Sequence, residues 1–244
     1  MIYGGPMKII IVRIGDKYGP EYETYLEKKL SDYEVIWIRE PIEDNIWLQW
    51  NKMAGMNIDT NEPICVMDID ILLVNDYKEV FEYPIEHGQF LAMPGWWGGA
   101  LKGDYKINGG FFKYYPKECK YIWEEFMSDP MKWQRHYIKN GTTIGPVNGE
   151  QYFVEDQVKK RLELITLPDE WFTRWNAHVD FSAYGPAGSN SWMWQESITK
   201  KWNDVTGYDH IYLGGEFFPL IKMVHFTRSE NRPHDWKDYK LFLN

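Results

Sequence analysis

The stretch Ile64–Val74 has the sequence ICVMDIDILLV, an apolar segment interrupted by two carboxylates, Asp68 and Asp70. Residues i and i+2 of a strand lie on one face, so a strand through this segment would direct both side chains the same way. Two neighbouring anions at the end of a buried strand repel each other and resist the loss of water, so they need a cation. Hard oxygen ligands suit Mg²⁺ or Mn²⁺. The segment predicts a divalent metal site, with a pair of solvated strand-end aspartates as the alternative.

Strands and helices alternate before this segment. Apolar runs predict strands at 7–14 and 33–38, and helical spacing predicts helices at 21–30 and 46–56. A third strand lies within 63–74. The order strand, helix, strand, helix, strand predicts a parallel sheet with ligands at the carboxyl ends of its strands.

The chain after Val74 follows a different pattern. We expect strands at 90–93, 107–115, 164–167 and 221–226, helices at 118–127, 133–139, 151–162 and 191–204, and loops at 94–99, 140–148 and 181–190. No internal repeat and no linker between independent cores is evident. The sequence therefore predicts one mixed α/β domain over 1–244.

Charge and cysteine content limit the possible partners and compartment. The 27 Lys and Arg and 36 Asp and Glu residues give a formal net charge of −9, without a basic run. A nucleic-acid partner is therefore unlikely, because phosphate neutralisation supplies most of that affinity. Cys65 lies in the apolar stretch and is expected to be a buried thiol in a reducing compartment. The first residues lack a signal-peptide pattern, and no apolar stretch approaches a membrane span, so we expect a cytoplasmic protein.

Aromatic residues are abundant, with 13 Trp and 17 Tyr. Most are expected in the core, and some would line a cleft where flat rings stack on sugars or bases. Trp96 and Trp97 are adjacent in the glycine-rich segment 94–99. They are candidates for a lid or an acceptor platform, and packing that anchors the loop is the alternative.

Four segments, in order, resemble one enzyme family. Asp68-Ile69-Asp70 after the third strand looks like the metal motif of GT-A nucleotide-sugar glycosyltransferases. The later segments resemble its retaining, glycogenin-like and galactosyltransferase-like branch: Asn108-Gly109-Gly110-Phe111-Phe112; Gly149-Glu150-Gln151 with Glu155-Asp156-Gln157; and Val224-His225-Phe226 with Arg232-Pro233-His234-Asp235-Trp236. The resemblance spans nearly the whole chain. In the C-terminal segment, Thr227-Arg228-Ser229 follows where the family usually has Gly.

The resemblance implies a GT-A fold, with a Rossmann-like nucleotide-binding half at 7–75 and a sugar and acceptor half at 76–244. It implies a metal-dependent hexosyltransferase that uses Mn²⁺ or Mg²⁺. The donor would be a nucleoside diphosphate sugar, a UDP-sugar rather than a GDP-sugar, with glucose or galactose as the first sugars to try. The acceptor, whether glycan, protein or lipid-linked sugar, stays open. The resemblance to the retaining branch implies transfer with retention, which would need no strong base, and inversion is the alternative.

The same resemblance assigns roles to individual residues. The metal ligands would be Asp68, Asp70 and His225. Asn108, with Gly109 and Gly110, would back the donor sugar, and Arg232 would replace the family's Lys on the diphosphate. The residues expected near the anomeric carbon are Asp156, Gln157 and Glu155.

Each assignment has a structural alternative. His225 could be a buried, hydrogen-bonded histidine, and the segment 108–110 a turn or bulge. Glu155 and Asp156 could be first-turn carboxylates that the helix dipole favours.

The first βα turn is the expected nucleotide position by the strand-end rule. Arg13 and Tyr18 are candidates there, and a surface turn is the alternative. Lys52 is expected to face the same cleft from the second helix.

Three other functions are considered. A phosphatase of the haloacid dehalogenase type carries its Asp-x-Asp on the first strand and usually continues with Gly or Thr, unlike this chain. A non-catalytic sugar-binding protein on a degenerate GT-A scaffold is opposed by the intact Asp68, Asp70 and His225. A nucleotidyltransferase usually carries a Gly-rich Arg/Lys signature near its first strand, which this sequence lacks.

Overall fold

The structure, a computed structural model, describes residues 5–97, 105–143, 149–175, 198–213, 215–226, 240 and 242–243. Contacts divide the chain into two compact units. The first unit comprises Met1–Ile69, Tyr83–Gly95 and Ala100–Leu167, and the second comprises Asp70–Glu82, Trp96–Gly99 and Pro168–Asn244. The predicted functional halves, 7–75 and 76–244, stay a prediction.

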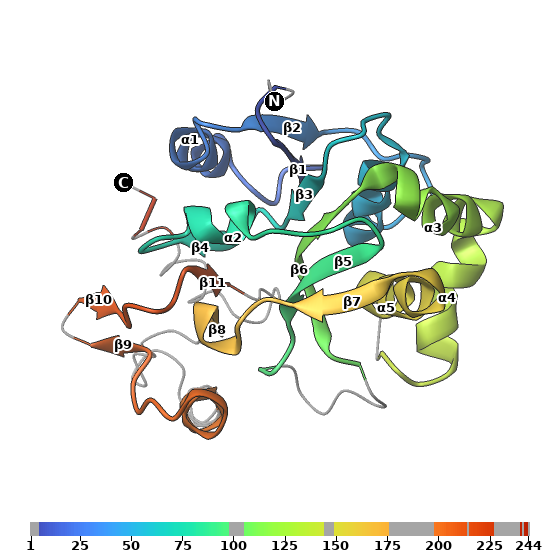
Figure 1. The fold of residues 1–244 in the computed structure, drawn as a ribbon. Helices are drawn as coiled ribbons and strands as arrows, with labels where there is room; N and C mark the ends of the chain where they lie inside the picture. Colours follow the sequence, from blue (N-terminus) through green and yellow to red (C-terminus); the bar gives the residue numbers. More distant parts are fainter. Residues whose placement is uncertain are drawn as a thin grey trace. The chain divides into compact units, whose positions relative to one another are not determined.

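A six-stranded mixed sheet forms the centre of the first unit, in the order β2-β1-β3-β6-β5-β7 (Figure 1). Its strands are β1 (Lys8–Val12), β2 (Glu34–Ile38), β3 (Ile64–Met67), β5 (Gln89–Pro94), β6 (Ile107–Tyr114) and β7 (Glu163–Thr166). β1 is parallel to β2 and β3, as helical crossovers require. β6 runs antiparallel between β3 and β5, and β7 is parallel to β5. The predicted α/β class with a mixed central sheet is confirmed.

The helical segments of the first unit are α1 (Pro20–Lys29), the 3-10 segment η1 (Leu48–Asn57), α3 (Pro116–Ser128), α4 (Pro130–Lys139) and α5 (Gly149–Arg161). Asp129 separates α3 from α4. Its carboxylate accepts a hydrogen bond from the Lys132 N–H at 2.9 Å, and Pro130 occupies the first turn, so α4 has both features of a stable helix start. The helix predicted at 46–56 is present as the tighter η1.

Large aromatic side chains join these helices. Trp50 of η1 is fully buried, stacks on Phe126 of α3 with ring centroids 5.2 Å apart, and packs against Phe153 of α5 at 5.7 Å. Gly149 begins α5 against the same indole, because a Cβ there would lie 3.0 Å from Trp50 Cζ2. This close approach determines where α5 starts and so where the following two residues lie.

The second unit contains two small sheets. Its described elements are β4 (Ile71–Leu73), α2 (Lys78–Glu82), η2 (Asp169–Trp171), β8 (Phe172–Arg174), β9 (Tyr212–Leu213), β10 (Glu216–Phe217) and β11 (Met223–His225), and residues 198–206 are helical. β11 is the central strand of the order β4-β11-β8, antiparallel to β4 and parallel to β8. β9 and β10 pair as an antiparallel ribbon.

The strand predicted within 63–74, ending at Asp68-Ile69-Asp70, is present as β3, but the placement of both aspartates on that strand is wrong. β3 ends at Met67 and pairs in the large sheet, whereas β4 begins at Ile71 and pairs with β11 in the other unit. Asp68 and Asp70 lie in the turn between them. The same-face argument therefore does not apply to the two aspartates, because the ladder partners of this apolar run change at the turn.

Candidate active site

β6 and the start of α5 meet at Gly109. A Cβ on Gly109 would lie 2.8 Å from Glu150 Oε1 and 3.3 Å from Gln151 Cβ, so the absence of a side chain permits this approach. The Gly109 N–H donates to Gln151 Oε1 at 3.0 Å. Asn108 Oδ1 accepts from the Gly110 N–H at 2.8 Å, and the β5–β6 register shifts between Ala92 and Met93, where Met93 pairs with Asn108. The bulge expected as an alternative for 108–110 is thus present within the pairing of this strand.

Lys52, Asp68 and Glu150 form a charge cluster in the first unit, in which Lys52 and Glu150 are buried and Asp68 is partly exposed. Lys52 Nζ lies 2.5 Å from Asp68 Oδ1 and 3.5 Å from Glu150 Oε1, and donates to Gly109 O at 2.8 Å. The Asp68 N–H donates to Gly110 O at 2.9 Å, which places Asp68 beside β6. Lys52 and Glu150 are each only 4% exposed. One ammonium therefore compensates two carboxylates in a region of low polarity.

Burial determines the electrostatics of Glu150. Loss of hydration raises the pKa of this carboxyl above its ordinary value, the nearby Asp68 raises it further, and Lys52 lowers it. Desolvation penalises the charged form, so Lys52 is what allows a carboxylate at this position. Loss of the Lys52 charge would consequently raise the pKa of Glu150 further.

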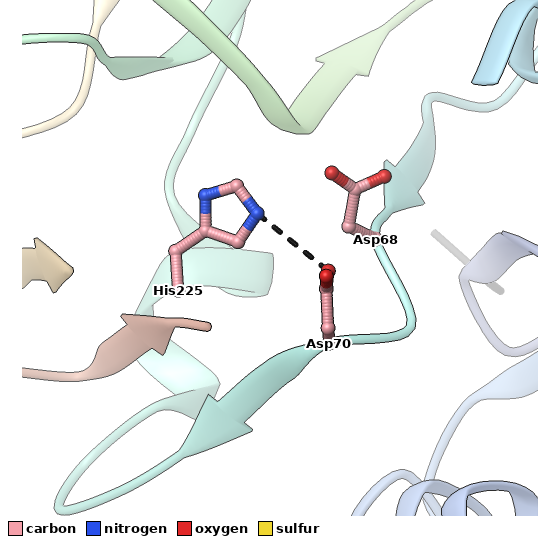
Figure 2. A group of neighbouring side chains, drawn as sticks. All are labelled: Asp68, Asp70 and His225. Atoms are coloured by element: carbon pink, nitrogen blue, oxygen red, sulfur yellow. Dashed lines mark ion pairs between the residues drawn. The ribbon is translucent and has the colours of Figure 1, made fainter. Parts of the chain in front are cut away.

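Asp70 and His225 lie together in the second unit. The backbone holds them there, because the Phe226 N–H donates to Asp70 O at 2.9 Å and the Trp175 N–H donates to His225 O at 3.1 Å. Figure 2 shows the imidazole turned toward the Asp70 carboxylate, with His225 Nε2 3.6 Å from Asp70 Oδ1. The two side chains are 8% exposed. A carboxylate oxygen and an imidazole nitrogen thus face each other near the turn that carries both aspartates.

These donor atoms fit a divalent cation. One ligand atom each from Asp68, Asp70 and His225 lies within 4.8 Å of the others, and Ile69 alone separates Asp68 from Asp70 in the chain. Asp70 Oδ1 and His225 Nε2, 3.6 Å apart, would hold such an ion together with Asp68. Two carboxylates and one imidazole suit Mn²⁺ or Mg²⁺ in such a site.

The second cluster predicted from the sequence makes different contacts. Glu155 is fully buried, accepts from the backbone N–H groups of Lys106 and Ile107 at 2.9–3.1 Å, and pairs with Lys159. Asp156 Oδ2 accepts from Tyr105 at 3.0 Å and from Tyr137 at 2.6 Å. These hydrogen bonds tie α5 to β6 and α4.

Gln157 belongs to the same network, since its Oε1 accepts from Lys160 Nζ at 2.8 Å. The side chains of residues 155–157 thus have hydrogen-bond partners within the protein. Their catalytic role stays a prediction.

The predicted nucleotide residues also have protein partners. Arg13 Nη1 pairs with Glu23 at 2.9 Å, and Arg13 Nε donates to Tyr18 O at 3.1 Å. Arg39 pairs with the other oxygen of Glu23 at 3.0 Å. The Arg13–Glu23 ion pair thus connects the first βα turn to α1. Nucleotide binding by Arg13 and Tyr18 stays a prediction.

The two adjacent tryptophans belong to the second unit and differ in burial. The Trp96 indole N–H donates to Asp169 O at 3.2 Å, and its ring lies 5.9 Å from that of Trp202. Trp97 is 2% exposed, and its ring meets the imidazole of His225 edge-on. Packing therefore anchors Trp97, whereas Trp96 is partly exposed.

Sequence reasoning did not select Arg174 or the Glu150–Gln151 pair as site residues. Arg174 is 5% exposed and pairs in register with His225 on adjacent parallel strands, so both side chains leave the same face of that sheet. A guanidinium in the aromatic run 171–175 was the available signal. Glu150 and Gln151 belong to the family-like segment Gly149-Glu150-Gln151, but no local feature of the sequence favours them over residues 155–157 as the reaction centre. Arg232 and Trp236 lie outside the described residues.

Within the described part of the chain, no helix combines the length and the apolar character needed to cross a membrane.

Comparison with known proteins identifies the fold. The glycosyltransferase GlyE of Streptococcus pneumoniae TIGR4 matches with a TM-score of 0.51 and 12% identity, over 99% of this chain and 63% of its own. The galactosyltransferase LgtC, solved with donor and acceptor sugar analogs, matches with a TM-score of 0.50 and 10% identity, over 97% and 95% of the two chains. The bifunctional glycosyltransferase WbbM matches with a TM-score of 0.52 and 11% identity, over all of this chain and half of its own.

No family model and no curated protein sequence matches the chain. The chain spans less than two thirds of GlyE and half of WbbM, but almost the full length of LgtC. At this identity the likeness concerns architecture, and it confirms the GT-A fold predicted from the sequence.

Proposed function

We propose that this protein is a metal-dependent glycosyltransferase that moves a sugar from a nucleoside diphosphate sugar, a UDP-sugar first of all, to an acceptor hydroxyl. The observation that carries the proposal is the convergence of Asp68, Asp70 and His225 on a GT-A fold. LgtC, described as a galactosyltransferase with donor and acceptor sugar analogs, supports sugar transfer as the reaction to test first.

In this proposal Asp70 and His225 hold a divalent cation, Mn²⁺ or Mg²⁺, with Asp68 as its third ligand. The bound ion supplies positive charge to the diphosphate that leaves as the glycosidic bond breaks. His225 presents Nε2, the nitrogen nearer Asp70. Asp68 would have both the cation and Lys52 as partners, since Lys52 already contacts its Oδ1.

Arg174 is proposed as a cation for the same diphosphate. It leaves the sheet beside His225, and adjacent strands lie about 4.8 Å apart, so a phosphate on a His225-bound ion would be within reach of a long guanidinium side chain. A guanidinium binds phosphate oxygens in pairs. Arg232 keeps the role that the family resemblance implies.

The sugar side of the site is proposed at Glu150 and Gln151 rather than at Asp156. Glu150 is buried against Lys52 and Asp68, and Gln151 is held by the Gly109 N–H. These groups would orient the sugar hydroxyls and stabilise positive charge at the anomeric carbon. We favour retention, because Glu150 is paired with Lys52 and is poorly suited to act as a strong base.

A transfer assay tests the proposal. UDP-glucose, UDP-galactose, GDP-mannose and CMP-sialic acid are each incubated with the chain, with Mn²⁺ or with EDTA, and release of the nucleotide is followed. Metal-dependent release of UDP is expected, and NMR of the product gives its anomeric configuration. Binding of UDP without turnover on any acceptor would favour the non-catalytic alternative. Release of pyrophosphate from a nucleoside triphosphate would favour a nucleotidyltransferase.

A further inference from the structure

Trp97 packs directly against the imidazole of His225. The ring centroids are 6.4 Å apart and the ring planes are inclined by 73°, an edge-to-face arrangement. Trp97 itself is 2% exposed and meets Trp96 edge-on at 5.3 Å, and Trp96 in turn packs against the fully buried Trp202. The Trp97 indole is therefore packed against Trp96, and Trp96 against Trp202, within the same unit.

The backbone fixes the position of the His225 main chain but not the orientation of its imidazole ring. β11 is the central strand of its sheet, and the His225 carbonyl accepts a hydrogen bond from Trp175. The χ2 torsion of histidine, by contrast, is broad and has no sharp preference of its own. The orientation of Nε2 toward Asp70 must then depend on what packs against the imidazole faces and edges.

We propose that Trp97 is a positioning residue for the metal site: its indole restricts rotation of the His225 imidazole and keeps Nε2 directed at Asp70. The cation then binds a ligand pair that is already oriented, and less side-chain freedom is lost on binding. This inference rests on the proposed metal site but concerns residues that the metal does not touch. It assigns a function to the buried member of the tryptophan pair.

The expected effect is a change in metal affinity. Groups that orient metal-bound histidines commonly change affinity by about 10- to 100-fold, and a packing contact is expected at the lower end, about 10-fold. Trp97→Leu removes the aromatic edge but keeps an apolar side chain. Trp97→Phe keeps an aromatic ring and should recover most of the affinity.

The experiment titrates Mn²⁺ into the full chain by calorimetry and repeats it with Co²⁺, whose visible absorption reports ligand geometry. Trp37→Leu is the control, since Trp37 is a partly exposed tryptophan of β2 whose indole N–H donates to Glu27. Asp70→Ala defines binding outside the site. Circular dichroism with EDTA checks that each variant is folded, and Trp97→Met, which also removes the aromatic edge, serves as the test variant if Trp97→Leu is not.

Support consists of three results: about 10-fold weaker Mn²⁺ binding and an altered Co²⁺ spectrum in Trp97→Leu, a smaller loss in Trp97→Phe, and no further loss when Trp97→Leu is added to His225→Ala. The last result is required because Trp97 is proposed to act through His225. Unchanged affinity in the folded Trp97→Leu or Trp97→Met variant, or an equal loss in the His225→Ala background, overturns the inference alone. A parent chain that binds neither Mn²⁺ nor Co²⁺ overturns the proposed metal-dependent function as well.

Discussion

The ammonium of Lys52 lies 2.5 Å from the carboxylate of Asp68, which Ile69 alone separates from Asp70 in the chain. An internal cation thus already compensates the first aspartate of the proposed metal motif. The same ammonium reaches Glu150, 98 positions later in the chain. Lys52 therefore couples the charge of the motif to the start of α5.

Removing the Lys52 charge should destabilise the fold. Lys52→Met leaves Glu150 buried without its compensating charge, and loss of one partner of a buried ion pair costs about 3 kcal/mol or more. Urea unfolding measures the change, with Lys120→Met on the exposed surface of α3 as the control. Lys52→Met with Glu150→Gln should recover part of the loss. Equal unfolding free energies in parent and Lys52→Met would contradict this account of the cluster.

The stability of the parent should depend on pH through Glu150. Burial raises the pKa of Glu150 in the folded protein above its ordinary value of 4.5, so the folded state binds this proton more tightly than the unfolded chain does. The contribution of Glu150 is complete below the unfolded pKa and is lost as pH rises through the folded pKa. Glu150→Gln cannot ionise and should gain stability relative to the parent as the pH rises from 4.5 through the raised folded-state pKa of Glu150.

Unfolding free energies of the two proteins across this range provide the measurement. Glu124→Gln, at an exposed position of α3, should show a difference from the parent that does not change with pH. A Glu150→Gln difference that is equally flat would show that Glu150 is not desolvated in solution.

Loss of a metal ligand should abolish metal-dependent donor binding without unfolding the chain. Asp70→Ala removes the carboxylate that faces His225, so calorimetry with UDP and Mn²⁺ should show no Mn²⁺-dependent heat. His225→Ala should weaken Mn²⁺ binding by about 10- to 100-fold. Asp76→Ala, which removes an exposed carboxylate six residues after Asp70, should bind as the parent does. Unaltered binding in Asp70→Ala would place the metal elsewhere.

Turnover should distinguish the two acidic clusters of α5. Gln151→Ala removes a side chain that Gly109 holds at the proposed sugar site, and we expect kcat to fall about 100-fold with UDP binding preserved. Asp156→Asn retains an oxygen that accepts from Tyr105 and Tyr137, so turnover should change little. The opposite result, a large loss in Asp156→Asn and none in Gln151→Ala, would restore the reaction centre predicted from the sequence alone.

Local sequence was sufficient for the fold class and for the metal motif. The apolar runs at β1 and β3 have the length and composition of buried strands, and their alternation with helical spacing already specifies a parallel start to the sheet. Asp68 and Asp70 could be selected because carboxylates are costly in an apolar segment, whereas His225 was selected from the family resemblance. These inferences depend on neighbours in the chain, which a sequence displays directly.

Tertiary structure alone decided which polar residues meet. β3 and β4 belong to different ladders, and the two aspartates lie in the turn between them, because β4 finds its partner in β11, about 150 residues later. α5 is buried around most of its circumference, so hydrophobic periodicity does not tell which face meets β6. Glu150 and Gln151 face Gly109, while Asp156 faces two tyrosines. Such choices arise from packing between segments distant in the chain, and no local pattern encodes them.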